Sequence, residues 1–381
     1  MSSALETLLA RFDPTLPLER ARTIPAAWYH DHELAAAERQ RVFGNAWLLA
    51  GRADQVGDPG SFFTVDLAGE PIVVARDEEG TLRAFHNVCR HRGARVACEE
   101  EGRATRLRCR YHGWTYDLAG RLRGTPEFDG VQEFRREDNG LPPVAADVAG
   151  PLVWVHAGPH PTPLAEWVGP LQRRGSLAVL AGFRWHSRRE YRLACNWKVF
   201  VDNYLDGGYH VNTVHPGLAG VIDYKSYRTE IDEHTSVQIS PLRPGRDEDE
   251  VAQVRSGGSA YYWWIFPNLM INLYEKALDT NLVLPDGPDA CRVIFDFFFR
   301  DSDTCFIEQS LTVAHQIQLE DADICEEVQR GLHSRSYDTG RFSVRREPAG
   351  YHFHQLLARW LADHKPDAPA RDGPLAGASG L

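Results

Sequence analysis

Short apolar runs separated by glycine-containing turns dominate the chain between about residues 45 and 157. Residues 62–65, 71–75 and 152–155 have the length and the β-branched or aromatic content of strands. The segment 77–80, Asp-Glu-Glu-Gly, follows the second run and is typical of a hairpin turn. The pattern predicts an antiparallel, all-β domain in this part of the chain.

Beyond residues 158–163, which are rich in glycine and proline, helical patterns mix with strand patterns. Residues 291–299 are expected to form a central strand, and residues 196–213 and 312–332 to form helices. The Gly-Gly pair at 207–208 falls inside the first helix, where each glycine costs about 1 kcal/mol relative to alanine. We therefore expect a distortion there, and an α+β fold for the chain as a whole.

Two further segments complete the predicted organisation. Residues 1–44 contain a helical pattern at 33–40 and are expected to pack as an N-terminal helical segment on the second domain. Residues 366–381 are rich in proline, alanine and glycine, which predicts a flexible tail.

The helix predicted near the C-terminus combines an apolar stripe with an acidic residue on the same face. The apolar residues recur with helical spacing at Ile317, Ile324, Val328 and Leu332. Asp321 falls on this inward stripe and Asp323 does not. The face of Asp323 also carries Glu320, Glu327 and Arg330, as a solvated face would. Because a buried carboxylate is costly unless it is paired or binds a metal, Asp321 is the candidate metal ligand and Asp323 the alternative.

The chain of 381 residues, 43% hydrophobic and 25% charged, has the size and composition of two ordinary globular domains. Its formal net charge of −11 and its lack of a polybasic cluster argue against nucleic acid as a partner. No window reaches the roughly 18 apolar residues of a membrane span, and residues 1–18 do not resemble a secretory signal. We therefore expect a cytoplasmic protein that does not bind a membrane.

Seven cysteines do not suggest a disulfide framework, but two of them stand in a metal-binding pattern. Residues 89–91 read Cys-Arg-His and residues 109–112 read Cys-Arg-Tyr-His, with seventeen residues between them. This spacing can hold a [2Fe–2S] cluster with thiolates on one iron and imidazoles on the other. The candidate ligands are Cys89 and Cys109 on the first iron and His91 and His112 on the second. A structural zinc ion accepts the same ligand types and is the alternative.

A second candidate metal site lies within residues 202–215. His210 and His215 can be two ligands of a 2-His-1-carboxylate triad, which leaves open positions on non-haem Fe(II) for O₂. Two histidines at this spacing are weak as an isolated signal, since many such pairs lie on surfaces or pack in cores. Here an Asn-Tyr pair and a carboxylate precede them, and the cysteine–histidine pattern lies upstream. Asp321 would complete the triad.

Both motifs resemble those of a known family. Residues 87–93 and 109–116 look like the two cluster-binding loops of a Rieske domain, apart from Arg110, which stands where proline is usual. Residues 202–215 resemble the catalytic half of Rieske non-haem iron oxygenase α subunits, closest in look to choline monooxygenase-like members of the aromatic ring-hydroxylating oxygenase family. The resemblance implies an all-β Rieske domain at 45–158 and a catalytic domain at 159–365 with an antiparallel sheet flanked by helices.

The resemblance also implies the cofactors and the electron supply. A Rieske [2Fe–2S] cluster and a mononuclear Fe(II) would together activate O₂ to oxygenate a small-molecule substrate. Because the sequence has no flavin or dinucleotide fingerprint, electrons are expected from a separate NAD(P)H-dependent reductase, directly or through a ferredoxin. The sequence leaves open whether one or two oxygen atoms are inserted and whether a β subunit joins.

An aromatic-dense stretch at 261–266 offers candidate substrate contacts, Tyr262 and Trp264, and Tyr274 follows it. Aromatic faces attract quaternary ammonium groups, which favours a choline-like or betaine-like substrate for a monooxygenase. These residues could instead be core residues of a strand, since only about half of a strand's side chains can face a pocket. An aromatic hydrocarbon, oxidised by a dioxygenase, is the alternative substrate, and a glutamate in the pocket would favour the cation. A Rieske electron carrier without oxygenase activity is a third reading.

Asn203 and Asp206 are assigned to the catalytic site as well. Asp206 lies four residues before His210, hence on the same face of the predicted helix, where its carboxylate can accept a hydrogen bond from the histidine. In the family that this chain resembles, the equivalent carboxylate bridges to a cluster histidine of a neighbouring subunit. The resemblance thus implies a homotrimer, in which Asp206 contacts His112 or His91 across the interface; a helix-capping or solvated role for Asp206 is the alternative.

Overall fold

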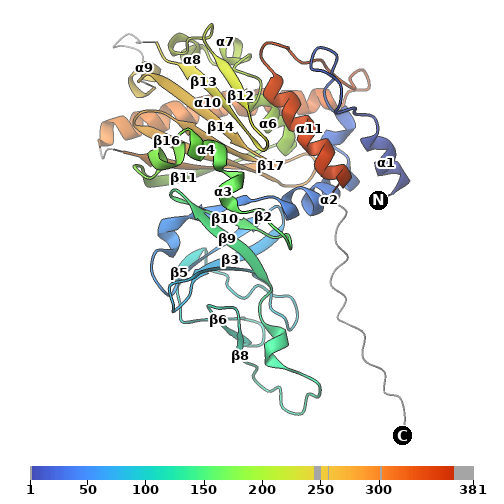
Figure 1. The fold of residues 1–381 in the computed structure, drawn as a ribbon, viewed down its shortest axis with the longest axis vertical. Coiled ribbons are helices and arrows are strands. Elements are labelled where there is room, and N and C mark those ends of the chain that lie inside the picture. Colours follow the sequence, from blue (N-terminus) through green and yellow to red (C-terminus); the bar gives the residue numbers. More distant parts are fainter. Residues whose placement is uncertain (1, 244–249, 256, 301–302, 364–381) are drawn as a thin grey trace.

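The computed structural model describes residues 2–243, 250–255, 257–300 and 303–363. Figure 1 shows an all-β lobe in its lower half and, above it, a larger lobe in which helices surround a second sheet. The N-terminal helices, of which the first is α1 (Ser3–Leu9), and the last helix, α11 (Pro348–Asp363), lie side by side at the edge of the larger lobe. The predicted tail at 366–381 lies outside the described residues.

The all-β lobe contains an antiparallel sheet in the order β1-β10-β9-β4-β3-β2-β5. Its strands are β1 (Leu48–Arg52), β2 (Ser61–Leu67), β3 (Glu70–Arg76), β4 (Leu82–His86), β5 (Glu101–Arg103), β9 (Pro143–Ala149) and β10 (Leu152–His156). A smaller sheet of β6 (Arg106–Arg108), β7 (Thr115–Asp117) and β8 (Leu122–Gly124) lies at the end away from the larger lobe. The strands predicted at 62–65, 71–75 and 152–155 are confirmed, and the turn predicted at 77–80 joins β3 to β4.

The larger lobe is built on an antiparallel sheet in the order β11-β17-β16-β15-β14-β13-β12. Its strands are β11 (Arg184–Leu193), β12 (Arg228–Ile231), β13 (Thr235–Pro241), β14 (Ser259–Ile265), β15 (Leu269–Leu273), β16 (Ala277–Pro285) and β17 (Cys291–Phe299). The strand predicted at 291–299 is confirmed as β17, an interior strand between β11 and β16. The expected α+β architecture is therefore confirmed.

Helices cover this sheet and its edges. They are α3 (Leu164–Trp167), α4 (Gly169–Arg173), α5 (Ser176–Leu180), α6 (Trp197–Tyr204), α7 (Val211–Val214), α8 (Pro216–Val221), α9 (Glu250–Val254), α10 (Thr304–Leu332) and α11 (Pro348–Asp363). Helix α6 contacts β16, α10 contacts β11, and α6 and α10 contact each other. Within the described part of the chain, no helix is both long enough and apolar enough to cross a membrane.

Two helix predictions need correction. The helix expected at 196–213 ends at Tyr204, and a turn separates α6 from α7, so the expected distortion is a complete break. Helix α10 begins at Thr304 rather than at residue 312, because the Asp303 carboxylate caps it by accepting from the backbone N–H of Cys305.

The inward face of α10 is one residue out of phase with the predicted stripe. The residues of α10 that are buried after its first turn include Leu311, Ala314, Gln318, Cys325, Gln329 and Leu332. Val328, predicted to face inward, is 44% exposed. The apolar pattern misplaced the stripe because two of the buried side chains are amides; that of Gln329, for example, accepts from the backbone N–H of Asn196 at 2.9 Å.

The N-terminal segment is attached to α6 by a buried ion pair. In α2 (His32–Arg41), which confirms the helix predicted at 33–40, the Glu38 carboxylate accepts from Lys198 Nζ at 2.7 Å and from Trp197 Nε1 at 2.9 Å. The side chains of Glu38 and Lys198 are 2% and 0% exposed. Removal of either charge would leave the other unpaired in the core.

Lys198→Met should therefore destabilise the fold strongly. An unpaired buried charge costs about 3–5 kcal/mol, so the urea midpoint followed by tryptophan fluorescence should fall clearly. Glu327→Gln is the matched control, because it breaks an exposed ion pair with Arg330 and should leave the midpoint unchanged. Equal midpoints for wild type and Lys198→Met would contradict the structural role of the buried pair.

Candidate metal centres and pocket

The four candidate cluster ligands lie in two loops of the same construction. In each loop the cysteine carbonyl accepts from a glycine four residues later, from Gly93 at 2.9 Å and from Gly113 at 3.0 Å. Both glycines have a left-handed conformation, with φ of 72° and 75°, which allows the tight turn. The structure thus brings Cys89, Cys109, His91 and His112 together, with the two imidazole rings 4.6 Å apart.

The cluster loops bury the thiols and present the histidines toward the surface. Cys89 and Cys109 are buried, whereas His112 is exposed. His91 stacks on Trp114, and its Nδ1 atom is buried without a hydrogen-bond partner among the described residues, as expected of an atom reserved for a metal. Two thiolates and two imidazoles in this arrangement fit a dinuclear iron–sulfur cluster.

Tyr116 is a residue of this site that the sequence analysis missed. Its hydroxyl accepts from the backbone N–H of Arg90 at 3.1 Å and lies 3.5 Å from Cys89 Sγ. The hydroxyl hydrogen is therefore available to the sulfur. A hydrogen bond to a cluster sulfur raises the reduction potential, because it stabilises the added negative charge.

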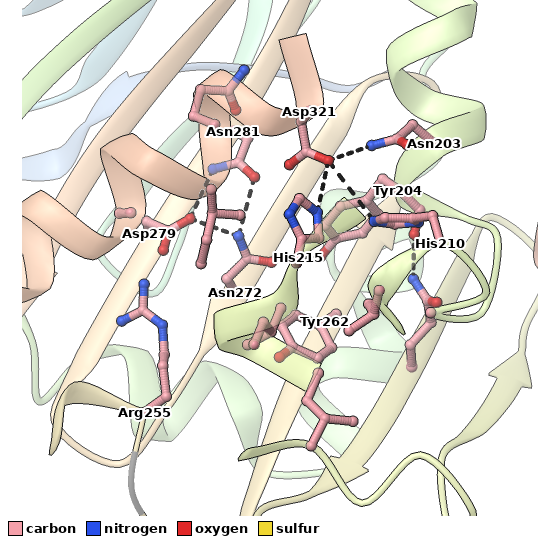
Figure 2. Close-up of a pocket in the computed structure, with 18 of the residues that line it drawn as sticks. Asn203, Tyr204, His210, His215, Arg255, Tyr262, Asn272, Asp279, Asn281 and Asp321 are labelled. Carbon is pink, nitrogen blue, oxygen red and sulfur yellow. Dashed lines mark hydrogen bonds and ion pairs between the residues drawn. The ribbon is translucent and has the colours of Figure 1, made fainter. Parts of the chain in front are cut away.

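The second site is formed by the segment around α7 and by α10. One ligand atom from each of His210, His215 and Asp321 lies within 4.8 Å of the others (Figure 2). Asp321 Oδ1 is 3.1 Å from His215 Nε2 and 3.8 Å from His210 Nε2. Asp323 is exposed and takes no part in this group. The structure therefore brings together the set that the sequence predicted, two imidazoles and one carboxylate within reach of a single ion.

A glycine turn positions His210. After α6 the chain passes through Gly207 and Gly208, both left-handed at φ of 68° and 71°. The Asp206 carboxylate accepts from the backbone N–H of Tyr209 at 3.0 Å and from His210 Nδ1 at 2.6 Å. Asp206 and His210 thus meet as predicted, but the reason was wrong: they share a turn rather than a helical face.

A second carboxylate holds the other histidine. Glu320 Oε2 is 2.7 Å from His215 Nδ1, and Asn203 donates to Asp321 Oδ1 at 2.7 Å. Burial alone would lower the pKa of His215, but its contacts with Asp321 and Glu320 outweigh this and raise it. The prediction that Glu320 is a solvated residue was wrong. The sequence did contain a signal for this role, because Glu320 stands next to Asp321. A histidine that binds a metal through one ring nitrogen needs a hydrogen-bond acceptor for the other.

A cavity of about 110 Å³ opens onto the three candidate ligands. Four tyrosines line it, Tyr204, Tyr227, Tyr262 and Tyr274, together with Phe200 and Phe295. The polar side chains on its lining include Gln238, Arg255, Asn272, Asp279 and Asn281. Tyr227 and Tyr262 are nearly parallel at 15°, and Tyr262 is nearly perpendicular to Tyr274 at 81°, so the rings face the cavity from different directions.

Two of the three predicted pocket aromatics line this cavity and one does not. Tyr262 and Tyr274 do, whereas Trp264 is fully buried against Phe266 and Phe353. Trp264 follows Tyr262 by two residues in β14 and shares its face of the sheet, but α11 covers that part of the strand. The acidic residue on the cavity wall apart from Asp321 is Asp279, not a glutamate.

The two metal sites define the class of protein. Residues 46–135 match the Rieske [2Fe–2S] domain, and residues 180–363 match the catalytic domain of ring-hydroxylating alpha subunits. The chain is thus an oxidoreductase with a Rieske cluster and a mononuclear non-haem iron. This pair of domains fits neither a structural zinc protein nor a Rieske protein that only carries electrons. It belongs to the Rieske oxygenase family.

Individual relatives cover nearly the whole chain. Choline monooxygenase of Arabidopsis thaliana is 42% identical over 369 residues, which are 93% of this chain and 86% of the relative. The carnitine monooxygenase oxygenase subunit of Escherichia coli K12 is 26% identical over 91% of this chain and 95% of its own length.

Solved structures share the fold. A quaternary ammonium Rieske monooxygenase, for which inter-subunit electron transfer has been described, has a TM-score of 0.82 at 24% identity, over 91% of this chain and 99% of that chain. Naphthalene 1,2-dioxygenase from Rhodococcus sp. has a TM-score of 0.78 at 22% identity, over 96% and 100% of the two chains.

Gly207→Ala should disrupt the second site while sparing the first. A Cβ at Gly207 would overlap the carbonyl oxygen of Arg346, and alanine disfavours the left-handed conformation. We expect the mononuclear iron to be lost while the visible spectrum of the cluster remains.

Gly331→Ala is the matched control, because a Cβ there meets nothing within 4 Å and alanine is the better helix former by about 1 kcal/mol. Iron analysis of both variants checks the prediction. Full iron content in Gly207→Ala would show that the turn does not position His210.

Proposed function

We propose that this chain is the oxygenase component of a monooxygenase acting on a small quaternary ammonium substrate of the choline or betaine type. The observation that carries the proposal is the tyrosine-lined cavity that opens onto His210, His215 and Asp321. Aromatic faces attract quaternary ammonium groups most strongly where water is excluded. The similarity to choline and carnitine monooxygenases supports the same substrate class.

The cavity suits a cation better than an aromatic hydrocarbon. Burial raises the pKa of Tyr204, Tyr227 and Tyr262 well above the usual value, so their phenols stay neutral and offer π faces. An arene bound in the cavity would displace water from Asp279, Asn272 and Asn281 and would offer these polar groups no hydrogen-bond partner in return. A trimethylammonium group instead presents positive charge to both the rings and the carboxylate.

We assign the cofactors to these residues by the chemistry of the donors. Cys89, Cys109, His91 and His112 would hold the cluster, and His210, His215 and Asp321 would hold the mononuclear iron. In the second site each histidine Nδ1 is bonded to a carboxylate, which leaves both Nε2 atoms directed at Asp321. These carboxylates fix the ring orientation and increase the basicity of the ligand nitrogens.

The overall reaction inserts one atom of O₂ into a substrate C–H bond and reduces the other to water, consuming two electrons and two protons. When bound, the two iron centres supply O₂ activation and electrons. The protein's own contribution is positional: the tyrosines hold the cation, Asn203 fixes the Asp321 carboxylate, and Asp206 and Glu320 orient the histidines. The substrate carbon thereby lies next to the iron site.

We further propose that electrons pass between subunits of a homotrimer, after delivery by a separate NAD(P)H-dependent reductase. The cluster loop that carries His112 joins β6 to β7, at the end of the all-β lobe that points away from the catalytic lobe in Figure 1. Exposed His112 is therefore directed outward. Asp206, bonded to His210, is the group that would receive His112 or His91 of a neighbouring copy.

Turnover tests the function directly. Protein supplied with a reductase and NADH should consume O₂ on addition of choline or a betaine and give an oxidised or demethylated product by mass spectrometry. Naphthalene and indole should give no product. Product from the arenes alone, with none from quaternary ammonium compounds, would contradict the proposal.

Iron content tests the ligand assignment. Asp321→Ala should lose the mononuclear iron and turnover, because it removes an anionic ligand, while Asp323→Ala, on the solvent side of the same helix, should change neither. His91→Ala should abolish the Rieske spectrum, while His210→Ala should keep it. Equal loss of iron in both aspartate variants would contradict the assignment of Asp321 as the carboxylate ligand.

Asp206→Asn tests the route between subunits. The variant should retain both iron centres but oxidise the reduced cluster more slowly in a single turnover. A neutral amide cannot carry the negative charge that the carboxylate places between His210 and the cluster histidine of the neighbouring copy. Glu320→Gln, which alters the other histidine's partner, serves as the comparison. Cluster oxidation at the wild-type rate in Asp206→Asn would exclude the bridge.

A further inference from the structure

We propose that Arg255 binds a carboxylate on the substrate, so that this enzyme acts on quaternary ammonium compounds that also carry a carboxylate and discriminates against choline. The inference rests on the proposed function and narrows it. The cavity that is proposed to bind a cation contains a buried cationic side chain of its own.

Arg255 follows α9 and lines the cavity while only 4% exposed. Its guanidinium lies over the ring of Tyr274, with Cζ 4.2 Å from the ring centroid. Its Nε atom is buried and has no hydrogen-bond partner among the described residues. The guanidinium hydrogen-bonds the side chain of Tyr274, and Asp279 acts on it through charge rather than through a hydrogen bond. The side chain thus keeps donors directed into the cavity.

Asp279 is the nearest candidate to neutralise this charge, and it is engaged elsewhere. Its Oδ2 accepts from Asn272 at 2.7 Å and from Asn281 at 2.8 Å. Burial raises the pKa of Asp279, and the charge of Arg255 only partly opposes this. Arg255 and Asp279 therefore lie in the same pocket without forming a direct pair.

A buried guanidinium without a carboxylate partner is costly, because it has lost its hydration. Its planar set of donors matches the two oxygens of a carboxylate, which makes arginine the side chain best suited to bind one. A substrate carboxylate would supply the missing partner. Choline carries no anion and would leave the Nε donor of Arg255 without a partner at this end of the cavity.

The positions of the side chains suit a substrate with opposite charges at its two ends. Figure 2 shows Arg255 and His210 on opposite sides of the cavity, with Tyr262 between them. A carboxylate at Arg255 would place the ammonium group over the tyrosines and its attached carbons toward the candidate iron ligands. Arg255 would thus set both the choice of substrate and its orientation.

The experiment compares three ligands of the iron-loaded enzyme: glycine betaine or carnitine, choline, and the methyl ester of the carboxylated compound. The wild type should favour the free carboxylate over choline and over the ester by about 10- to 100-fold in kcat/KM and in Kd, the range expected for a hydrogen-bonded charge pair. The ester keeps the ammonium group and removes only the negative charge. This comparison needs no variant, so it holds even if a substitution at Arg255 impairs folding.

Variants add a second readout. Arg255→Gln should raise KM for the carboxylated substrate by a similar factor, with little change for choline or the ester, and so abolish the preference. Arg255→Lys should restore part of it, since the charge remains without the planar donors. Arg330→Gln, in an exposed ion pair on α10, should leave all three ligands unchanged.

The outcomes separate this inference from the proposed function. Turnover of choline and the ester at least as efficient as that of the free carboxylate would overturn the role of Arg255 and leave the quaternary ammonium proposal standing. An unchanged preference in a correctly folded Arg255→Gln variant, with a normal Rieske spectrum, would overturn it as well. If no quaternary ammonium compound binds or is oxidised, both proposals fail.

Discussion

The catalytic lobe depends on a two-residue turn, Gly207–Gly208, that ends α6 and reverses the chain before α7. The close approach of Arg346 to Gly207 leaves no room for a side chain there. Because α6 stops at this point, Asn203 remains on the helix while His210 and His215 swing toward Asp321 on α10. In a continuous helix, His215 would lie about 140° around the axis from His210, so the two histidines could not both face Asp321.

Paired carboxylates and nitrogen donors hold the rest of the site. Asp206 and Glu320 each engage one candidate ligand histidine, and Asn203 engages the candidate ligand carboxylate. The buried Glu38–Lys198 pair attaches the N-terminal segment to α6. Hydrogen bonds of this kind are directional, so they restrict the orientation of the ligands more narrowly than apolar packing alone would.

Local motifs were readable from the sequence because their chemistry is set by spacing. The loops of Cys89 and Cys109, the His210–His215 pair and strand β17 all lie where the pattern predicted. Asp321 was also identified, although the stripe that pointed to it is out of phase, because Ile317 and Asp321 face the cavity rather than the core.

Residues that depend on contacts distant in sequence were missed. Glu320 was read as solvated because helical periodicity cannot show that His215, more than a hundred residues away in the chain, packs against it. Trp264 was predicted to line the pocket, but α11 covers it. This contact joins segments distant in sequence, so the local pattern could not show it. Arg255 gave no signal at all, since a single arginine after a short helix acquires meaning only when its burial is known.

The proposed function requires that one cavity holds both the mononuclear iron and the substrate cation. A crystal structure of the iron-loaded enzyme with a trimethylammonium compound, with anomalous data collected at the iron edge, tests it most directly. We predict a single iron peak between His210, His215 and Asp321 and a separate dinuclear peak between the two cysteine–histidine loops. Density for the ammonium group should lie against Tyr227 and Tyr262. An empty or iron-free triad, or a cation bound outside this cavity, would contradict it.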